Sequence, residues 1–209
     1  MTGALGRLRR LEAALRAEGI GPLDLLTDHR PPEPLRHYPD GDLYDPRSAA
    51  QAYFHVHRPQ ESGHIHLFLR PAGMPAGMVP LVPAAGDPKA PCHLGAVELD
   101  HRGMPCALFA TNRWVTGEAW FAAADVALLL VRFRLDLPPP HDRLGRWLSA
   151  LGDVHRPALA ELARRRDAAL ADLAGGRSLE DRLEDETLEV LARMPLPPGP
   201  GAGMIPANL

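Results

Sequence analysis

Four histidines stand close together in one short segment, and their spacing is the strongest chemical signal in the sequence. They are His55, His57, His64 and His66, within AYFHVHRPQESGHIHLFL. Imidazole nitrogen is a common ligand of zinc, copper, iron and nickel, whereas calcium and magnesium prefer shells made of oxygen. The cluster therefore predicts a transition-metal cofactor, with iron as the first expectation and zinc or copper as the alternatives.

The same segment has the alternating pattern of a β-hairpin. Apolar residues alternate with histidines on both sides of a turn at residues 59–62. Successive side chains of a strand point to opposite faces, so the two apolar sets are buried together only if they share one face. The histidines and Tyr53 then share the other face. Pairing His64 with either His57 or His55 keeps all four histidines there, with directly opposed Cβ atoms about 4.5 to 5.5 Å apart.

Four further residues are candidates for completing such a site. Glu61, in the turn, offers a carboxylate as a metal ligand or general base, and His93, at the start of a second predicted hairpin, offers another imidazole. Arg113 follows a predicted strand and is a candidate substrate anchor, because a guanidinium group binds a carboxylate through two parallel hydrogen bonds. Tyr53 is placed to hydrogen-bond an oxygen-bearing ligand. The predicted partner is a small-molecule substrate or the metal ion itself.

Several kinds of function fit this donor set. Three protein ligands and an open position are typical of a catalytic metal, and four closed ligands of a structural one. The first hypothesis is a metal-dependent enzyme, an oxidoreductase of the non-haem iron type, because two histidines and a carboxylate are the ligands of iron oxygenases. A zinc hydrolase, with Glu61 as the base, is an alternative. The others are a non-enzymatic metal-binding or sensing protein and a metal-free module, whose histidines bind an anion or form a purely structural face.

The elements that must position these residues indicate an α+β fold. We expect a small antiparallel sheet of about four strands, formed by hairpins at residues 51–70 and 92–112, with several helices on its apolar face. The Pro-, Asp- and Gly-rich segment from Gly21 to Ser48 is expected to be irregular and to cover part of the histidine face. Helices are predicted at residues 4–16, 116–133, 142–173, with a bend near Pro157, and 178–193.

Composition and charge indicate the number of domains and exclude some kinds of partner. The 209 residues are expected to form a single domain over residues 1–195, followed by a flexible tail over 196–209. The net charge of -3, with both signs spread along the chain, argues against nucleic acid as a partner. The longest apolar run, AAADVALLLV, is far shorter than the roughly 20 residues that cross a bilayer, so no membrane partner is expected.

The first residues and the cysteines bear on the compartment. The segment Met1–Gly19 has the pattern of an amphipathic helix, without the apolar core of a secretory signal. Cys92 and Cys106 form no disulfide framework or Cys-x-x-Cys motif. These features predict a cytoplasmic protein with free thiols. Apolar residues left over on the helices are compatible with a homodimer.

Two resemblances add to this interpretation. The spacing His55-x-His57-x3-Glu61 is similar to the first metal motif of cupins, and Pro88-x-Ala90-x-x-His93 resembles part of their second motif. The likeness is local and implies a shared donor arrangement, not a cupin barrel. Over most of the chain, the succession of HYP-x-GD, YFHVHRPQESGHIHLFLR and LFATNRWVTGE resembles an uncharacterised bacterial family of unknown function. That resemblance implies one domain and no particular activity.

Overall fold

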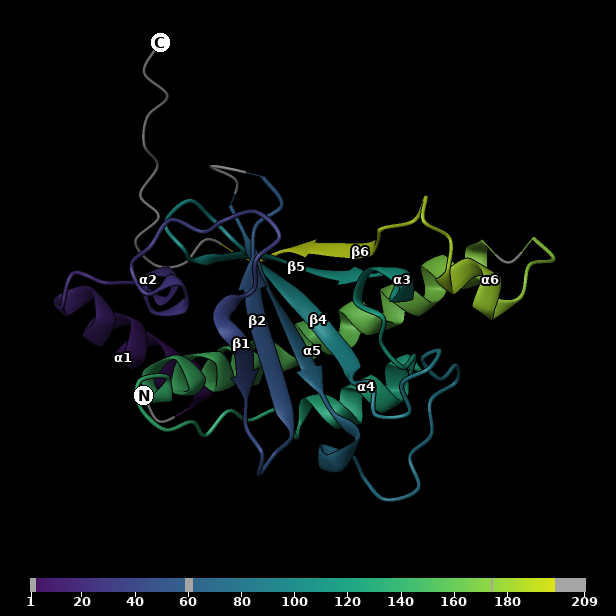
Figure 1. The fold of residues 1–209 in the computed structure, drawn as a ribbon, viewed down its shortest axis with the longest axis horizontal. Coiled ribbons are helices and arrows are strands. Elements are labelled where there is room, and N and C mark those ends of the chain that lie inside the picture. The colour runs from purple at the N-terminus through teal and green to yellow at the C-terminus, as the bar shows by residue number, and fades with distance from the viewer. Residues whose placement is uncertain (1–2, 59–61, 174, 198–209) are drawn as a thin grey trace, which may run out of the picture.

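The computed structural model describes residues 3–58, 62–173 and 175–197. Its centre is one antiparallel sheet in which each strand pairs with the next along the chain, in the order β1-β2-β3-β4-β5-β6 (Figure 1). The strands are β1 (Tyr38–Tyr44), β2 (Ala50–His55), β3 (His64–Leu69), β4 (Cys92–Leu99), β5 (Pro105–Thr111) and β6 (Val190–Pro195).

Helices cover one face of this sheet. The long helix α5 (Asp142–Asp172) crosses behind the strands, and α1 (Ala4–Ala17) and α4 (Ala123–Leu130) pack against it (Figure 1). The shorter elements lie at the ends of the sheet: α2 (Pro22–Thr27), the 3-10 turn η1 (Pro71–Gly73), α3 (Arg113–Thr116) and α6 (Leu179–Leu183). The opposite face of the sheet is left to polar and aromatic side chains.

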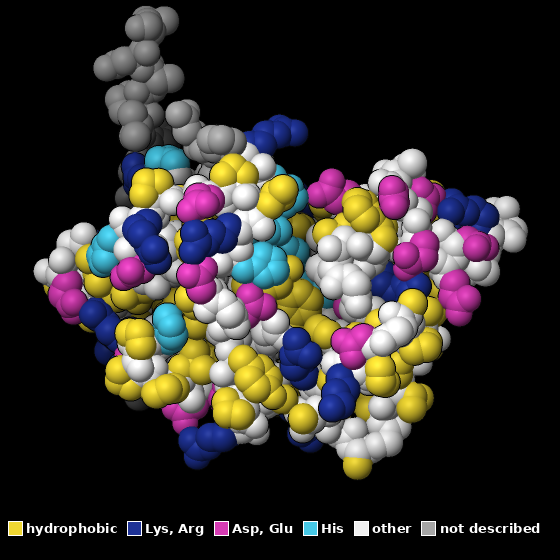
Figure 2. Space-filling model, in the orientation of Figure 1, with side chains coloured by type: hydrophobic (Ala, Val, Ile, Leu, Met, Phe, Trp, Pro, Cys, Tyr) yellow, Lys and Arg dark blue, Asp and Glu magenta, His cyan; other side chains and the backbone are white. Residues whose placement is uncertain are grey.

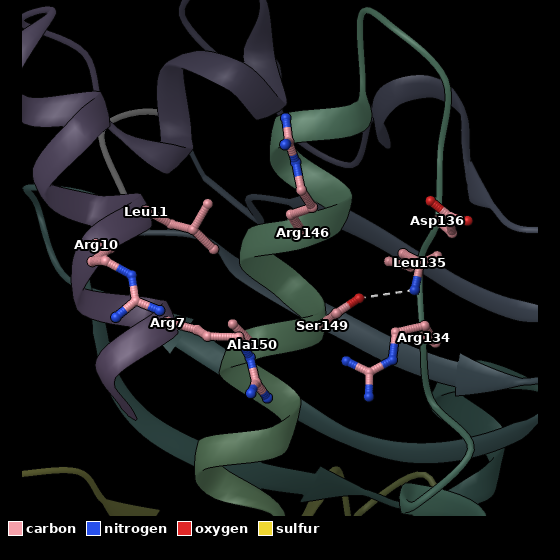
Figure 3. Close-up of a pocket in the computed structure, with 9 residues that line it drawn as sticks. All are labelled: Arg7, Arg10, Leu11, Arg134, Leu135, Asp136, Arg146, Ser149 and Ala150. Atoms are coloured by element: carbon pink, nitrogen blue, oxygen red, sulfur yellow. Dashed lines mark hydrogen bonds between the residues drawn. The ribbon is translucent and has the colours of Figure 1, made fainter. Parts of the chain in front are cut away.

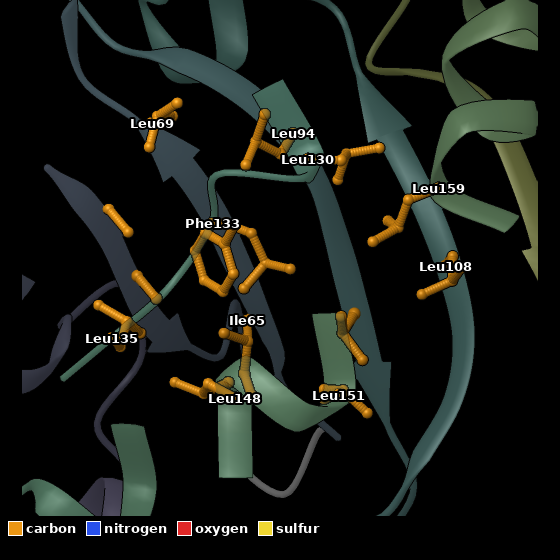
Figure 4. Packing of buried hydrophobic residues seen from close by; sticks show 14 of the residues in the cluster. Ile65, Leu69, Leu94, Leu108, Leu130, Phe133, Leu135, Leu148, Leu151 and Leu159 are labelled. Atoms are coloured by element: carbon orange, nitrogen blue, oxygen red, sulfur yellow. The ribbon is translucent and has the colours of Figure 1, made fainter. Parts of the chain in front are cut away.

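The hydrophobic core lies between the sheet and the helices. Figure 4 shows Ile65 and Leu108 of the sheet near Leu148, Leu151 and Leu159 of α5, and all five side chains are buried. Burying a side chain of this size contributes about 1.5 to 3 kcal/mol. Since Ile65 lies between two histidines in the sequence, this packing forces both of them onto the other face of β3.

The predicted combination of one antiparallel sheet with several helices is confirmed, but the expected number of four strands is wrong. The sheet has six strands, because β1 and β6 add one strand at each edge. β1 lies in the segment that we expected to be irregular. β6 begins inside the predicted helix over residues 178–193, because α6 ends at Leu183. Both added strands pair on one side only, so their sequences carry less of the apolar alternation that marks a buried strand.

Some of the helix predictions are confirmed and others are wrong. The first helix begins at Ala4 as expected, and the Ser178 hydroxyl caps α6 by accepting a hydrogen bond from the Asp181 backbone N–H at 3.1 Å. Thr116, expected to cap a helix, instead ends α3, because Gly117 follows in a left-handed conformation with φ of 63°. The following helix, α4, starts only after Ala122. Pro157 lies inside α5, which continues past it as one helix.

Two further expectations concern the cysteines and the membrane. Cys92 is buried, Cys106 is half-buried, and both are free thiols. Across residues 3–58, 62–173 and 175–197, the structure contains no helix whose length and apolar character would let it cross a bilayer. Most of the predicted tail, residues 198–209, lies outside the described part of the chain.

Candidate metal centre

The hairpin of β2 and β3 sets the register of the histidines. His55 pairs with His64 and Tyr53 with His66, which is one of the two registers that the sequence allows. The rings of His55 and His64 meet edge to face with centroids 4.4 Å apart, and their Nε2 atoms lie 2.6 Å apart. Two neutral imidazoles at this distance share one N–H between them, so the two Nε2 atoms face each other.

A third histidine, His57, lies beside this pair. His57 follows the end of β2, and its ring centroid lies 4.9 Å from that of His55 and 5.2 Å from that of His64. One nitrogen from each of the three rings fits within a separation of 4.8 Å. In a tetrahedral site with Zn–N bonds of about 2.0 to 2.1 Å, neighbouring nitrogens are roughly 3.3 Å apart. The separations in the structure, from 2.6 Å to at most 4.8 Å, lie on both sides of that value.

The two other predicted histidine ligands form a separate pair. Nδ1 of His66 lies 3.0 Å from Nε2 of His93, and both side chains are buried. On the far side of His93, Nδ1 lies 3.3 Å from the Thr111 hydroxyl and 3.8 Å from a carboxylate oxygen of Glu118. The other Glu118 oxygen accepts the His93 backbone N–H at 2.6 Å. The structure therefore divides the predicted ligand pool into a convergent trio and a hydrogen-bonded pair beside it.

Burial keeps these imidazoles in the neutral form that binds metals. Desolvation, together with the charges of neighbouring histidines, lowers the pKa of His55 to about 4 and that of His64 to about 3. Desolvation also lowers the pKa of His66 well below its ordinary value and, with the charge of Arg166, that of His93 to about 3. At neutral pH no proton has to leave these rings before an ion binds.

A β-bulge brings His93 to this face of the sheet. Leu67 pairs with Gly95 and Phe68 with His93, so Leu94 is an extra residue in β4. In regular pairing Leu94 would oppose Phe68, and His93 would point toward the helices. Gly95 permits the bulge because it adopts φ of 132°, where a side chain is strained, and because a Cβ there would lie 2.9 Å from the Leu159 side chain.

Tyr53 and His37 form a wall of the site. Their rings stack with centroids 3.7 Å apart and an angle of 7° between the planes. Nδ1 of His37 lies 3.1 Å from the Asp42 carboxylate, which also accepts a hydrogen bond from the Gln51 amide at 2.6 Å. Desolvation, with the charges of Asp42 and Glu118, raises the pKa of Tyr53 to about 12. The phenol therefore stays protonated and can act as a hydrogen-bond donor at this wall.

A cavity of about 290 Å³ adjoins the trio. The histidine side chains gather in a hollow at the centre of this face (Figure 2). The volume is close to the lower end of the roughly 300 to 1,000 Å³ of small-molecule pockets. Histidines 57, 64 and 66 form one side, and the remaining lining residues are Ser62, Glu98, Phe109, Thr111, Val115, Glu189, Val190 and Arg193.

Comparison with known proteins places the chain in a family. A family model described as a domain of unknown function, DUF6969, matches residues 3–196. The chain belongs to this family. No curated protein matches it, and no solved structure does. The DUF6969 match agrees with the resemblance to an uncharacterised family, and it gives no support to the local likeness to cupins.

Two further predicted residues of this DUF6969 domain are Glu61 and Arg113. Glu61, the expected carboxylate ligand or base, lies outside the described residues. Arg113, the expected substrate anchor, is buried and points elsewhere, since its guanidinium lies 2.6 Å from the Glu184 carboxylate and donates to the Pro83 carbonyl at 2.8 Å. Its contacts join the start of α3 to distant loops, and it does not line the cavity.

The cavity wall contains residues that sequence reasoning missed. Phe109 meets the His64 ring edge to face at 5.0 Å, and Glu98, opposite His64 in the register, accepts two hydrogen bonds from Arg193 at 2.9 and 3.0 Å. The alternation of β5 places Phe109 on the face opposite Leu108, but only the pairing of β5 with β4 shows that this face carries the histidines. The sequence around Arg193 does not indicate that this residue lies at the site, because its position depends on β6 pairing with β5, which is far away in the sequence.

Proposed function

We propose that this protein is a metal-dependent enzyme that holds a transition-metal ion through His55, His57 and His64. The observation that carries the proposal is the convergence of one nitrogen from each ring within 4.8 Å, at the side of a cavity of about 290 Å³. A substrate in that cavity would lie directly against the ion. The proposed substrate is a small molecule, since the cavity volume suits nothing larger.

Coordination number favours catalysis over storage. Three protein ligands leave at least one position of a tetrahedral ion for water or substrate, whereas structural sites are closed by four ligands. His57 and His64 supply nitrogens to the trio and also line the cavity, so the free position faces the space where a ligand fits. His66, which would be the fourth ligand of a closed site, is engaged with His93.

The first reaction class is an oxidoreductase of the non-haem iron type. Bound iron would supply oxygen chemistry, and the usual iron site adds a carboxylate to its histidines. That carboxylate would come from Glu61, four residues after His57. Tyr53 packs against His55 and His66 and does not line the cavity. Protonated at neutral pH because its pKa is raised to about 12, it would donate a hydrogen bond only to a substrate oxygen that reaches past these rings.

A zinc hydrolase is the second candidate, and the donor set of the described residues favours it. Three neutral imidazoles are also the zinc ligands of carbonic anhydrase, where the ion keeps its full charge and lowers the pKa of bound water to about 7. In this version of the proposal no redox-active ion is needed. The proton acceptor would be Glu98, which lines the cavity, or Glu61, which follows His57 by four residues in the sequence.

The experiment that tests the proposal is elemental analysis of the untagged protein beside two variants. The wild type and the control His101→Ala, altered in an exposed turn, should each hold about one equivalent of iron, zinc or copper. The double variant His55→Ala/His64→Ala should hold less than about a tenth of that, because two of three ligands are removed. Which ion is found chooses between the redox and hydrolytic versions.

The same preparations separate an enzyme from a storage protein. Loaded with Co²⁺, an open site should change its visible spectrum when azide is added, because the anion takes the free position. Trace metal at equal levels in wild type and double variant would overturn the metal site itself. One equivalent of metal with no azide response would retain the site and overturn its catalytic role.

A further inference from the structure

A second cavity lies on the helix side of the sheet, away from the histidines. It has a volume of about 500 Å³. Figure 3 shows that it is lined from three segments: Arg7, Arg10 and Leu11 of α1, Arg146, Ser149 and Ala150 of α5, and residues 134–136, which follow α4. The volume is well within the range of about 300 to 1,000 Å³ typical of small-molecule pockets.

Positive charge is concentrated around this cavity. Four of its nine lining residues are arginines, in a chain whose net charge is -3. Guanidinium groups of Arg7 and Arg134 both donate to the same oxygen of Asp153, at 2.9 and 3.1 Å. One carboxylate between two guanidinium groups leaves positive charge in excess.

Among the described residues, Asp136 and Asp142 do not remove the excess charge on Arg7 and Arg134. Arg146 is paired with Asp142 one helical turn before it. Asp136, the acidic residue in the lining, lies 2.8 Å from Arg47, a cation outside the cavity. Asp136 and Asp142 are thus each committed to one arginine, and the guanidinium groups of Arg7 and Arg134 keep further N–H donors for an added anion.

The floor between the arginines is apolar. Leu135 is 1% exposed and Ala150 is 3% exposed, and Leu11 adds a partly buried side chain from α1. The Ser149 hydroxyl oxygen accepts the Leu135 backbone N–H at 2.9 Å, which ties residues 134–136 to α5. An apolar floor with a cationic rim suits a ligand that has both an apolar body and an anionic head.

We propose that this cleft binds a small organic oxyanion, in which a carboxylate or phosphate head contacts the arginines and an apolar body lies on Leu11, Leu135 and Ala150. Arginine suits such a head because its planar guanidinium matches the oxygens of carboxylate and phosphate groups. The site lies on the other side of the sheet from the histidine trio, so this inference does not depend on the proposed metal chemistry.

The test is calorimetric titration of the full-length protein, kept in a chelator so that the metal site plays no part. The probes are octanoate, octyl phosphate, 1-octanol and inorganic phosphate. We expect one equivalent of octanoate or octyl phosphate to bind at least tenfold more tightly than 1-octanol or inorganic phosphate, because only the amphiphilic anions use both rim and floor. The tighter of the two identifies the preferred head group.

Variants with matched controls locate the site. Arg10→Gln/Arg146→Gln removes two cations of the rim, and Arg9→Gln/Arg143→Gln removes two from the same helices outside the cavity. The first pair should weaken binding of the tighter anion by about tenfold or more, since hydrogen bonds to charged groups are lost, and the second by less than about twofold. If the first double variant does not fold, each single change should weaken binding by about threefold.

Three results would overturn the proposal. Absence of binding by both amphiphilic anions at millimolar concentration would show that the cleft takes no such ligand. Equal weakening in the two double variants would reduce the effect to general charge attraction. Equal affinity for 1-octanol would show that the arginines take no part in binding.

Discussion

The five histidines of this sheet face have the same side chain but differ in burial and contacts. They are His55, His57, His64, His66 and His93. His57 is exposed just after the end of β2, and its ring meets those of His55 and His64 in edge-to-face contacts. His66 is 1% exposed, lies between the trio and His93, and shares a hydrogen bond with the latter. The first is free to adjust around an ion, and the second is part of the packed interior.

This contrast predicts opposite effects for two alanine substitutions. His57→Ala should abolish stoichiometric metal binding and change the free energy of unfolding, measured without metal, by less than about 0.5 kcal/mol, as for other surface positions. His66→Ala should retain one equivalent of metal and lose about 1 to 3 kcal/mol, because a buried nitrogen of His93 is left without its partner. Urea unfolding in a chelator and metal titration measure the two quantities separately.

The same two measurements would also show whether the ligands are assigned correctly. Metal loss in His66→Ala, with metal retained in His57→Ala, would mean that the ion lies deeper, between His66 and His93. Loss in both would indicate a site with four ligands. In either case the open position argued from the trio would have to be abandoned.

At the scale of elements, the bulge in β4 decides which side chains reach the site. With regular pairing, the alternation of β4 would expose Leu94 on the polar face and turn His93 into the helix side. Instead Leu94 is 2% exposed and belongs to the hydrophobic core. One irregular residue therefore satisfies both the core and the histidine face.

Gly95→Ala should consequently be far more damaging than an ordinary glycine substitution. We expect a loss of about 2 to 4 kcal/mol, since the added Cβ is strained at φ of 132° and lies 2.9 Å from Leu159 of α5. Gly77→Ala is the matched control, because Gly77 also has positive φ, at 79°, but nothing lies within 4 Å of its added Cβ. The control should lose about 1 to 2 kcal/mol from backbone strain alone. Equal losses in urea unfolding would show that the bulge does not depend on Gly95.

These elements also show how far the sequence alone predicts the site. The parity of apolar residues around Ile65 placed the four histidines on one face, because alternation is a local property of each strand. The bulge was not predictable, because it depends on contact between Gly95 and a helix more than sixty residues later. The edge strand β6 and its Arg193 were missed for the same reason, since pairing with β5 outweighs local helix propensity.

For the whole molecule, the sheet separates two chemically different surfaces. One carries neutral, desolvated imidazoles beside a cavity of about 290 Å³, and the other carries arginines around a cavity of about 500 Å³. The imidazoles couple the stability of the whole fold to pH, because most of them are buried in the uncharged form. Their protonation must therefore destabilise the folded state.

The free energy of unfolding, measured in a chelator, should fall steeply as the pH falls below 6.5. Unfolded histidines bind protons near pH 6.5, whereas His55 in the folded protein does so only near 4, and His64 and His93 near 3. Between these values the unfolded chain holds more protons and is favoured by acid, by about 1.4 kcal/mol per pH unit for each extra proton. Denaturant unfolding at a series of pH values measures this slope, and a flat profile between pH 6.5 and 4 would contradict it.

Glu118 should produce the opposite slope on the alkaline side. Its complete burial raises the pKa to about 8 against the opposing charge of Arg166, whereas the unfolded carboxyl titrates near 4.5. Between these values the folded protein holds a proton that the unfolded chain has lost, so stability decreases as the pH rises and levels off above 8. Combined with the histidines, this places maximum stability near pH 6.5. Glu118→Gln, whose amide oxygen can still accept the His93 N–H, should remove the decline from pH 6.5 to 8. It should also make the acid slope between pH 6.5 and 4.5 steeper by about 1.4 kcal/mol per pH unit, because the carboxyl no longer opposes the histidines there. If wild type and variant decline alike, Glu118 is ionised in the folded protein, and the charge of Arg166 outweighs the cost of burying it.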